Sequence, residues 1–282
     1  MRVLRISRPR FWIYELGPYM IGIIAALLYA NQWGWLDWWL IILLWRYFLI
    51  PANIWIYGIN DIYDYDTDKL NPKKQQYEAL VLPSEQWSLW KWMLVTTIPV
   101  VIIVSIVAPI YITVWLVLAI WLYSYYSATP IRAKARSYRD CIFSASLYTL
   151  PWVIWYLMIG ALWSLNRWYI LAGWCWCVAM QLYSAVPDIT ADTDAWLSTT
   201  ATVLWARHSI TTCAIFYLLA AILSYPALWI VSIILWVVYL VMMIRTLVRL
   251  QDISQIYRYF PWINMVSGMI IFLVLLYTFI YG

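Results

Sequence analysis

Long apolar runs separated by short polar segments make up most of the chain. We predict nine helices from these runs, over residues 11–30, 36–60, 87–108, 110–127, 140–162, 167–187, 209–224, 226–246 and 260–281. Most of the runs come close to the about 20 residues that a helix needs to cross a bilayer. The alternation of polar and apolar positions that would indicate membrane β-strands does not occur. The pattern therefore predicts an all-α integral membrane fold.

Composition and charge agree with this assignment and suggest an orientation. The chain is 66% hydrophobic and only 11% charged, whereas a soluble domain has about 25% charged residues. With nine spans, 16 of the 18 Lys and Arg residues fall on one side of the membrane. The positive-inside rule makes that side cytoplasmic. We expect a multi-pass protein of the plasma membrane that contacts lipids and binds no nucleic acid.

A dense acidic motif, N-D-I-Y-D-Y-D-T-D, follows the second apolar run directly, from Asn60 to Asp68. Asp61, Asp64 and Asp68 are spaced by three and four residues, which places them on one face of a helix end. So many carboxylates at a membrane helix end are costly unless cations offset their charge, and a divalent metal is the cation expected. Asp66 lies off this face, and we expect it to be solvated.

A second, sparser acidic motif follows the sixth apolar run. Asp188 and Asp192 repeat the i, i+4 spacing, while Asp194 falls off their face. Mg²⁺ takes hard oxygen ligands and completes its shell with water and phosphate oxygens. We therefore predict that both motifs hold Mg²⁺ ions bridged by a diphosphate, whose departure the metal promotes. The predicted metal-binding and catalytic residues are Asp61, Asp64, Asp68, Asp188 and Asp192, with Asn60 as a neutral oxygen ligand.

Basic residues on the same side are candidates to bind the phosphates. Arg132 and Lys134 lie in the loop after the fourth apolar run, and Lys73 and Lys74 follow the first acidic motif. Arg and Lys both suit phosphate oxygens, Arg as a planar fork and Lys as a point charge. The alternative is that these residues only set the topology and contact lipid headgroups, which is the role we assign to Arg8 and Arg10.

Polar and aromatic residues near the motifs suggest a lined cavity for an isoprenoid tail. Arg46, Asn53, Tyr57 and Asn60 fall on roughly one stripe of the second run, and polar groups in a span normally face the protein interior. We expect Asn53 to support the site, and Arg46 either to line the cavity or to form a structural ion pair. Aromatic rings stabilise cations, and the candidates for this role are Tyr57, Tyr63, Tyr126 and Tyr183.

Three ordered motifs resemble those of the UbiA superfamily of intramembrane prenyltransferases. That family carries N-D-x-x-D-x-x-x-D, then Y-S-x-x-P-x-R-x-K-x-R, then D-x-x-x-D. The matching residues are Asn60, Asp61, Asp64, Asp68, Tyr126, Ser127, Pro130, Arg132, Lys134, Arg136, Asp188 and Asp192. The resemblance implies one domain over residues 1–282, with nine helices around a central cavity that opens near the cytoplasmic face. It also implies that Tyr126, Ser127 and Lys73 join Asn60, Arg132 and Lys134 in binding a prenyl diphosphate with Mg²⁺.

Within the superfamily the wording is closer to the lycopene elongase branch. The similar stretches include Tyr57 to Asp68, Ser184 to Asp192 and Thr199 to Leu204, although Trp205 stands where a Gly is common. This resemblance implies transfer of a C5 unit from dimethylallyl diphosphate to a long polyene such as lycopene, with hydration in some members.

The motifs also allow comparison with two other functions. Aromatic-acceptor prenyltransferases of quinone biosynthesis, acting on 4-hydroxybenzoate or a naphthoate, often carry Tyr and Lys where this chain has Gln181 and Ala185. An aromatic-acceptor prenyltransferase remains the alternative hypothesis. A cation transporter would place acids deep in several spans, whereas here the acids cluster at one interface beside a basic loop.

Overall fold

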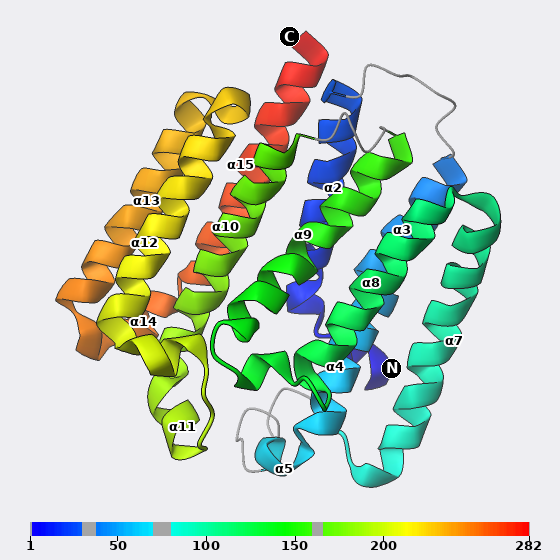
Figure 1. Ribbon diagram of the computed structural model, residues 1–282, viewed down its shortest axis with the longest axis horizontal. Helices are drawn as coiled ribbons and strands as arrows, with labels where there is room; N and C mark the ends of the chain where they lie inside the picture. Colours follow the sequence, from blue (N-terminus) through cyan, green and yellow to red (C-terminus); the bar gives the residue numbers. More distant parts are fainter. Residues whose placement is uncertain (1, 30–37, 70–79, 160–165, 282) are drawn as a thin grey trace.

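The structure is a computed structural model that describes residues 2–29, 38–69, 80–159 and 166–281. Helices account for its regular elements, and within these ranges the β-structure is a single parallel bridge between Arg136 and Ser198. The long helices run roughly side by side as a bundle (Figure 1). They are α2 (Trp12–Tyr29), α3 (Trp38–Leu49), α4 (Pro51–Tyr63), α7 (Pro83–Val107), α8 (Ile110–Ser127), α9 (Arg139–Ile159), α10 (Arg167–Ala185), α12 (Thr200–Leu228), α13 (Ile230–Val248) and α15 (Phe260–Tyr281).

Short helices gather at one end of this bundle, where the charged loops lie. They are α1 (Arg2–Ile6), η1 (Pro9–Phe11), α5 (Tyr65–Asp68), η2 (Ala133–Ala135), η4 (Val186–Asp188), α11 (Ile189–Asp194), η5 (Leu250–Asp252) and α14 (Ile253–Tyr257). In Figure 1, α5 and α11 both project from the lower end. The two acidic motifs therefore share one end of the molecule, as the sequence predicts.

Eight helical segments are long and apolar enough to cross a membrane, counted over the described ranges. In this count α3 and α4 form one span, Trp38–Tyr63, and α2 supplies a shorter apolar helix, Trp12–Leu28. The all-helical, multi-pass membrane fold is thus confirmed. The expected count of nine spans stays a prediction, because the first of them is the shorter helix.

The second predicted span differs from a continuous helix. It breaks at Ile50, whose φ is −121° and ψ is −60°, and resumes at Pro51, which has no N–H to donate to the preceding turn. The Asn53 amide donates hydrogen bonds to the carbonyls of Phe48 and Leu49, at 3.0 and 3.1 Å. Asn53 therefore satisfies backbone groups that the break leaves open, and this is the function that its contacts support.

The same break overturns the predicted polar stripe. Arg46 is exposed, whereas Asn53 is buried and Tyr57 and Asn60 are half-buried. A stripe extrapolated across seven-residue steps assumes one unbroken helix, and α3 and α4 are two. The expectation that Arg46 lines an interior cavity is therefore wrong.

The seventh predicted span, 209–224, is part of a longer helix. The helix α12 begins at Thr200, and the Thr199 hydroxyl accepts a hydrogen bond from the Thr202 N–H at its start. Trp205 interrupts it with φ 60° and ψ 166°, a backbone region that is essentially reserved for Gly. The backbone conformation of Trp205 therefore explains why Gly would suit this position better.

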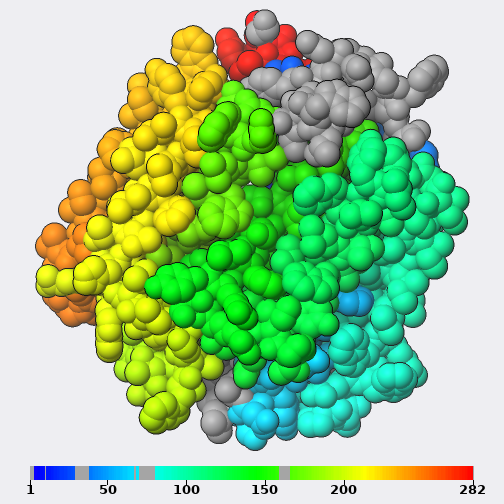
Figure 2. Space-filling model, viewed as in Figure 1, coloured from blue at the N-terminus to red at the C-terminus, as the bar shows by residue number. Residues whose placement is uncertain are grey.

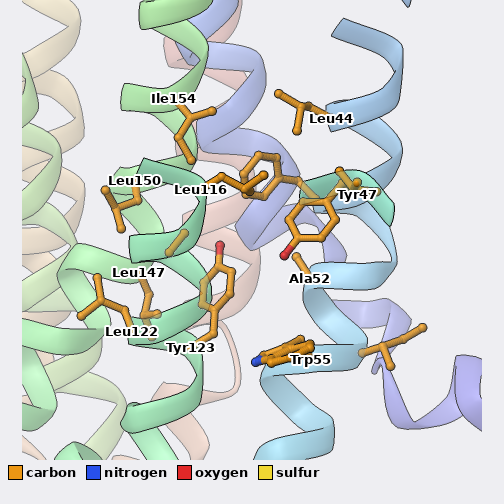
Figure 3. Packing of buried hydrophobic residues seen from close by; sticks show 14 of the residues in the cluster. Leu44, Tyr47, Ala52, Trp55, Leu116, Leu122, Tyr123, Leu147, Leu150 and Ile154 are labelled. Carbon is orange, nitrogen blue, oxygen red and sulfur yellow. The ribbon is translucent and has the colours of Figure 1, made fainter. Parts of the chain in front are cut away.

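Two large apolar clusters form the interior, and α9 lies between them. The first joins α3, α4, α7, α8 and α9, and includes Leu44, Tyr47, Leu116 and Ile154 (Figure 3). The second joins α10, α12, α13 and α15. Side chains fill the spaces between the ribbons on the face shown in Figure 2. Because α9 packs against α2, α8 and α10, the loop that precedes α9 lies at the junction of the two halves.

Candidate functional site

The end of α4 presents the first acidic motif. Asn60 and Asp61 lie in its last turn, Asp64 follows as the capping residue, and α5 carries the motif on to Asp68. Asp61 is buried, at 3% exposure, and Asp64 and Asp68 are half-buried. Asp66 is exposed and bonds to Lys69 at 2.7 Å. The residues predicted to face the site are therefore the more buried ones, and Asp66 is the solvated one.

Arg8 offsets the negative charge of the buried Asp61 carboxylate. Its guanidinium donates to the Asp61 carboxylate at 2.8 Å and lies over the Tyr57 ring, 4.6 Å from the centroid. A bond of this kind is charge-assisted and stronger than a neutral one. Arg8 was expected to set topology only, and the structure places it against the acidic motif instead. No local pattern predicts this contact, because the partners are 53 residues apart.

The basic loop between α8 and α9 reaches the same motif. The Lys134 ammonium donates to the Asn60 side-chain oxygen at 2.9 Å and also to the Asp64 carboxylate. Arg132 donates to Asp64 at 3.4 Å, and the Ser127 hydroxyl donates to Asn60 at 3.2 Å. The structure therefore brings together five of the residues that the sequence singled out.

Burial and charge act on Lys134 in opposite directions. Burial lowers the pKa of its ammonium below the usual value, and the Asp64 carboxylate opposes that shift. Removing water strengthens the attraction between the remaining charges. A lysine so placed is held at a fixed point, where it would meet an anionic oxygen without having to reorganise.

A hydrogen bond from helix α10 holds the Tyr126 side chain in place. Its hydroxyl accepts a hydrogen bond from the Gln181 amide at 3.2 Å, and the Gln181 oxygen accepts one from Ser144 at 2.8 Å. These contacts tie α8, α9 and α10 together one residue before Ser127. Gln181, which the sequence marked only as a departure from aromatic-acceptor enzymes, therefore positions a motif tyrosine.

The second acidic motif is more open. Asp188 is exposed at the end of η4, and Asp192 is half-buried in α11. The Asp192 carboxylate accepts a hydrogen bond from the Thr199 hydroxyl at 3.3 Å, and Asp188 is close enough to act on its charge. Asp194 is exposed, as expected for a residue off the shared face.

A buried carboxylate ties the basic loop to the second motif. Asp140, 2% exposed, accepts hydrogen bonds from the backbone N–H groups of Cys141 and Thr200, both at 2.9 Å, and from the Thr200 hydroxyl. The Tyr138 N–H donates to that hydroxyl at 2.6 Å. The basic loop is therefore bonded to the first motif through Lys134 and to the segment after the second motif through Asp140. Sequence analysis missed Asp140, and an acid directly after a basic run at a helix start was the available signal.

The remaining predicted residues fall elsewhere or outside the described ranges. Tyr63 is exposed, and Tyr183 packs in the second apolar cluster with its hydroxyl against Thr246 at 2.8 Å. Lys73 and Lys74 lie outside the described residues. The structure therefore supports Tyr57 and Tyr126 as partly buried rings beside the first motif, whereas Tyr63 lies within the motif but is exposed and Tyr183 lies away from it.

The arrangement combines oxygen donors with fixed cations. Within the described ranges, no group of three or more Asp, Glu, His or Cys side chains lies close enough together to hold a metal ion. The predicted five-carboxylate metal set therefore remains a prediction. What the geometry provides is a carboxylate and amide face at the end of α4, with Arg8, Arg132 and Lys134 directed at it. Such a site can bind an anion and a hard cation side by side.

The chain is similar to two curated relatives over nearly its whole length. The chain is 34% identical over 291 residues to the lycopene elongase/hydratase of Haloarcula japonica, with 99% of this chain and 92% of the relative covered. It is 34% identical over 284 residues to the lycopene elongase/hydratase of Corynebacterium glutamicum, with 97% of this chain and 96% of the relative covered. The similarity extends over nearly the whole chain in both cases.

Solved structures share the fold. A UbiA homologue from Aeropyrum pernix K1 superposes with a TM-score of 0.73 at 14% identity, over 95% of this chain and 98% of that one. A UbiA homologue from Archaeoglobus fulgidus bound to GPP and Mg²⁺ gives a TM-score of 0.70 at 18% identity, over 98% and 99%. The model of the UbiA prenyltransferase family matches residues 18–274. The chain therefore belongs to the UbiA prenyltransferase family.

Proposed function

We propose that this prenyltransferase moves an isoprenyl group from dimethylallyl diphosphate to a carotenoid acceptor such as lycopene, with Mg²⁺ as its metal. The curated relatives at about a third identity carry the name lycopene elongase/hydratase, which supports the acceptor. The observation that carries the proposal is the cation pair Arg132 and Lys134 directed at Asn60 and Asp64, because a diphosphate leaving group needs an anion site beside metal ligands.

The donor set suits magnesium. Asn60, Asp61, Asp64 and Asp68 offer only hard oxygen ligands at the first motif, the type that Mg²⁺ takes in proteins. Solved structures of the Archaeoglobus fulgidus UbiA homologue are bound to GPP and Mg²⁺ and to DMAPP and Mg²⁺. We propose that these residues hold the metal together with Asp188 and Asp192. Magnesium bound there would stabilise the charge that develops on the diphosphate as its carbon–oxygen bond breaks.

The chain's own residues would bind the diphosphate and stabilise the allylic cation. Lys134 and Arg132 would hold diphosphate oxygens, since both point at the motif from a loop bonded to two helices. Ser127 and Asn60 fix that loop to α4. The rings of Tyr57 and Tyr126 lie beside the motif, where an allylic cation would gain about 0.5–2 kcal/mol from each aromatic face. Ionisation of the donor supplies the electrophile, so no nucleophilic side chain is required.

The charged end of the bundle sets the proposed orientation. Both acidic motifs and the basic loop lie at that end (Figure 1), and 16 of the 18 Lys and Arg residues belong to it if the chain crosses nine times. We propose that this end faces the cytoplasm and that the protein resides in the plasma membrane. A water-soluble diphosphate would then reach the site directly, while the apolar acceptor would enter from the lipid.

Product analysis tests the proposal. Membranes containing the protein are incubated with labelled dimethylallyl, geranyl or farnesyl diphosphate and Mg²⁺, in the presence of lycopene, 4-hydroxybenzoate or a naphthoate. The proposal predicts that dimethylallyl diphosphate labels lycopene and that a chelator stops the labelling. Label on an aromatic acid instead of the polyene would overturn the carotenoid assignment, and full activity in chelator would overturn the metal requirement.

A further inference from the structure

An acidic side chain that the site described above does not use is buried among the helices. Glu15 lies in the first turn of α2 and is 2% exposed. The Tyr123 hydroxyl donates a hydrogen bond to its carboxylate at 2.7 Å. An ionisable side chain buried within a membrane bundle is costly and usually marks a functional position. The helix dipole stabilises an acid in the first turn whether its side chain is buried or exposed. The dipole therefore does not explain why Glu15 is buried.

Its neighbours are neutral rather than cationic. Tyr47 and Tyr148 lie within electrostatic reach of Glu15, together with Tyr123. In Figure 3 the hydroxyl oxygens of Tyr47 and Tyr123 point into the same space between α3 and α8. Among the residues that the structure describes, no Lys or Arg forms an ion pair with Glu15. The group is therefore a carboxyl surrounded by aromatic rings and hydroxyls, an environment that suits a transient positive charge.

The depth of this group matches the reacting carbons rather than the diphosphate. Tyr123 precedes Ser127 by one turn of α8, and Ser127 is the residue that bonds to Asn60. One turn of four residues corresponds to about 6 Å along a helix. Glu15 therefore lies about one turn deeper in the bundle than the first acidic motif, where the C5 tail of a donor and the double bond of an acceptor would meet.

The reaction needs a group with the chemistry of Glu15. When the acceptor double bond attacks the allylic carbon, a carbon–carbon bond forms and the acceptor becomes a tertiary cation. That cation becomes neutral by losing a proton from the adjacent carbon, whose C–H electrons form a new double bond, or by adding water and losing a proton from it. Both outcomes release one proton, which must go to a base close to the cation.

We propose that Glu15 accepts this proton and that Tyr123 orients its carboxylate. The proposal rests on the proposed prenyl transfer but not on the identity of the acceptor, because an aromatic ring attacked by the same electrophile also sheds a proton. It assigns Glu15 to the end of the reaction, after the diphosphate has left. The alternative is that the Glu15–Tyr123 bond only fastens α2 to α8.

Glu15→Gln separates these roles. Glutamine keeps the size of the side chain and an oxygen that accepts from Tyr123, but it takes up no proton at neutral pH. The proposal predicts that kcat falls by about 10²-fold or more, the usual contribution of a positioned base, while KM for the donor diphosphate is unchanged. A purely structural bond predicts an unchanged kcat, and that result would overturn the proposal.

Two further variants complete the test. Glu85→Gln makes the same chemical change at the start of α7, outside the site, and should leave kcat at the wild-type value. Glu15→Asp keeps the carboxylate but withdraws it, and should change the ratio of hydrated to unsaturated product. If Glu15→Gln does not fold, an unchanged product ratio in Glu15→Asp overturns the proposal.

The assay also separates this inference from the proposed function. If the wild-type protein prenylates an aromatic acid and not a polyene, the carotenoid assignment fails. The kcat comparison with that acid as acceptor then decides the role of Glu15.

Discussion

The two acidic motifs compensate their charge in different ways. In the first, Asp61 bonds to Arg8 and Asp64 bonds to Arg132 and Lys134. In the second, the bond shown for Asp192 comes from the neutral Thr199 hydroxyl. All of these bonds are charge-assisted because a carboxylate accepts them, and the bonds from Arg8, Arg132 and Lys134 also bring a full positive charge to the acceptor. The Asp61 and Asp64 carboxylates are therefore offset by cations of the protein itself, whereas the Asp192 carboxylate bonds to a neutral hydroxyl.

This difference suggests a division of work between the motifs. Fixed charges need no reorganisation when a ligand arrives, which is how a protein stabilises developing charge most effectively. The first motif, with its half-buried cations, would then define where the diphosphate sits. The second motif, more exposed and carrying two neighbouring carboxylates, would depend more on bound metal ions to offset its charge.

Asp64→Ala should have the largest effect. It removes the carboxylate that both Arg132 and Lys134 contact, and with it a proposed metal ligand. We expect the rate of prenyl transfer to fall by at least about 10³-fold, at the upper end of what a single preorganised electrostatic group contributes. Membrane insertion and helix content should not change. Asp66→Ala is the matched control, since Asp66 is exposed and off the shared face. Wild-type activity in Asp64→Ala would refute the role of the first motif.

Lys134→Met should weaken donor binding while leaving the fold intact. The methionine keeps the apolar stem but removes the ammonium that Asn60 and Asp64 share. Loss of a charged hydrogen bond of about 1.5–3 kcal/mol corresponds to a rise in the Kd for the donor of about 10–10²-fold. A titration with dimethylallyl diphosphate measures this. Lys69→Met, which removes an exposed cation, should have little effect, and equal losses in both variants would contradict a specific role for Lys134.

Much of this site could be predicted from the sequence because its spacing is local. The face shared by Asp61, Asp64 and Asp68 follows from helix geometry, and the structure keeps them more buried than Asp66. The basic loop was expected near the first motif, and Lys134 and Arg132 contact it.

The contacts that were missed join distant parts of the chain. Arg8 and Asp61 are 53 residues apart, Asp140 and Thr200 are 60 apart, and Glu15 and Tyr123 are 108 apart. Helical periodicity tells which residues share a face, but it does not tell which helices are neighbours. The misplacement of Arg46 has another cause. Pro51 lies within the apolar run and breaks it, so the periodicity before the proline does not continue after it.

Asp140→Ala should lower the stability of the protein, because it breaks the link between the two motifs. It leaves the buried Thr200 N–H and hydroxyl without their acceptor, which costs about 1–3 kcal/mol. We expect a lower Tm in detergent and a smaller loss of activity than in Asp64→Ala. Asp252→Ala, at the start of α14, serves as the control. If Asp140→Ala melts at the wild-type temperature, Asp140 does not tie the basic loop to α12.

Trp205→Gly should stabilise the helix that follows the second motif. Trp205 has φ 60° and ψ 166° and is 63% exposed, so the substitution relieves backbone strain and removes little packing. A residue held in this region costs of order 1–3 kcal/mol. We expect the free energy of unfolding to rise by about 1 kcal/mol, since glycine also gains freedom in the unfolded chain. Trp196→Gly, at φ 56°, is a useful comparison, and a fall in stability in Trp205→Gly would contradict the strain.

The two acidic motifs are proposed to hold one diphosphate between them. A double-mutant cycle on donor binding measures this coupling, with dimethylallyl diphosphate titrated in Mg²⁺ into wild type, Asp64→Asn, Asp192→Asn and the double variant. Groups that act on one ligand as a unit are strongly non-additive. We therefore predict that each single substitution raises the Kd severely and that the double variant binds about as weakly as the worse single one. Losses that simply multiply would show that the motifs act separately, and would contradict the account.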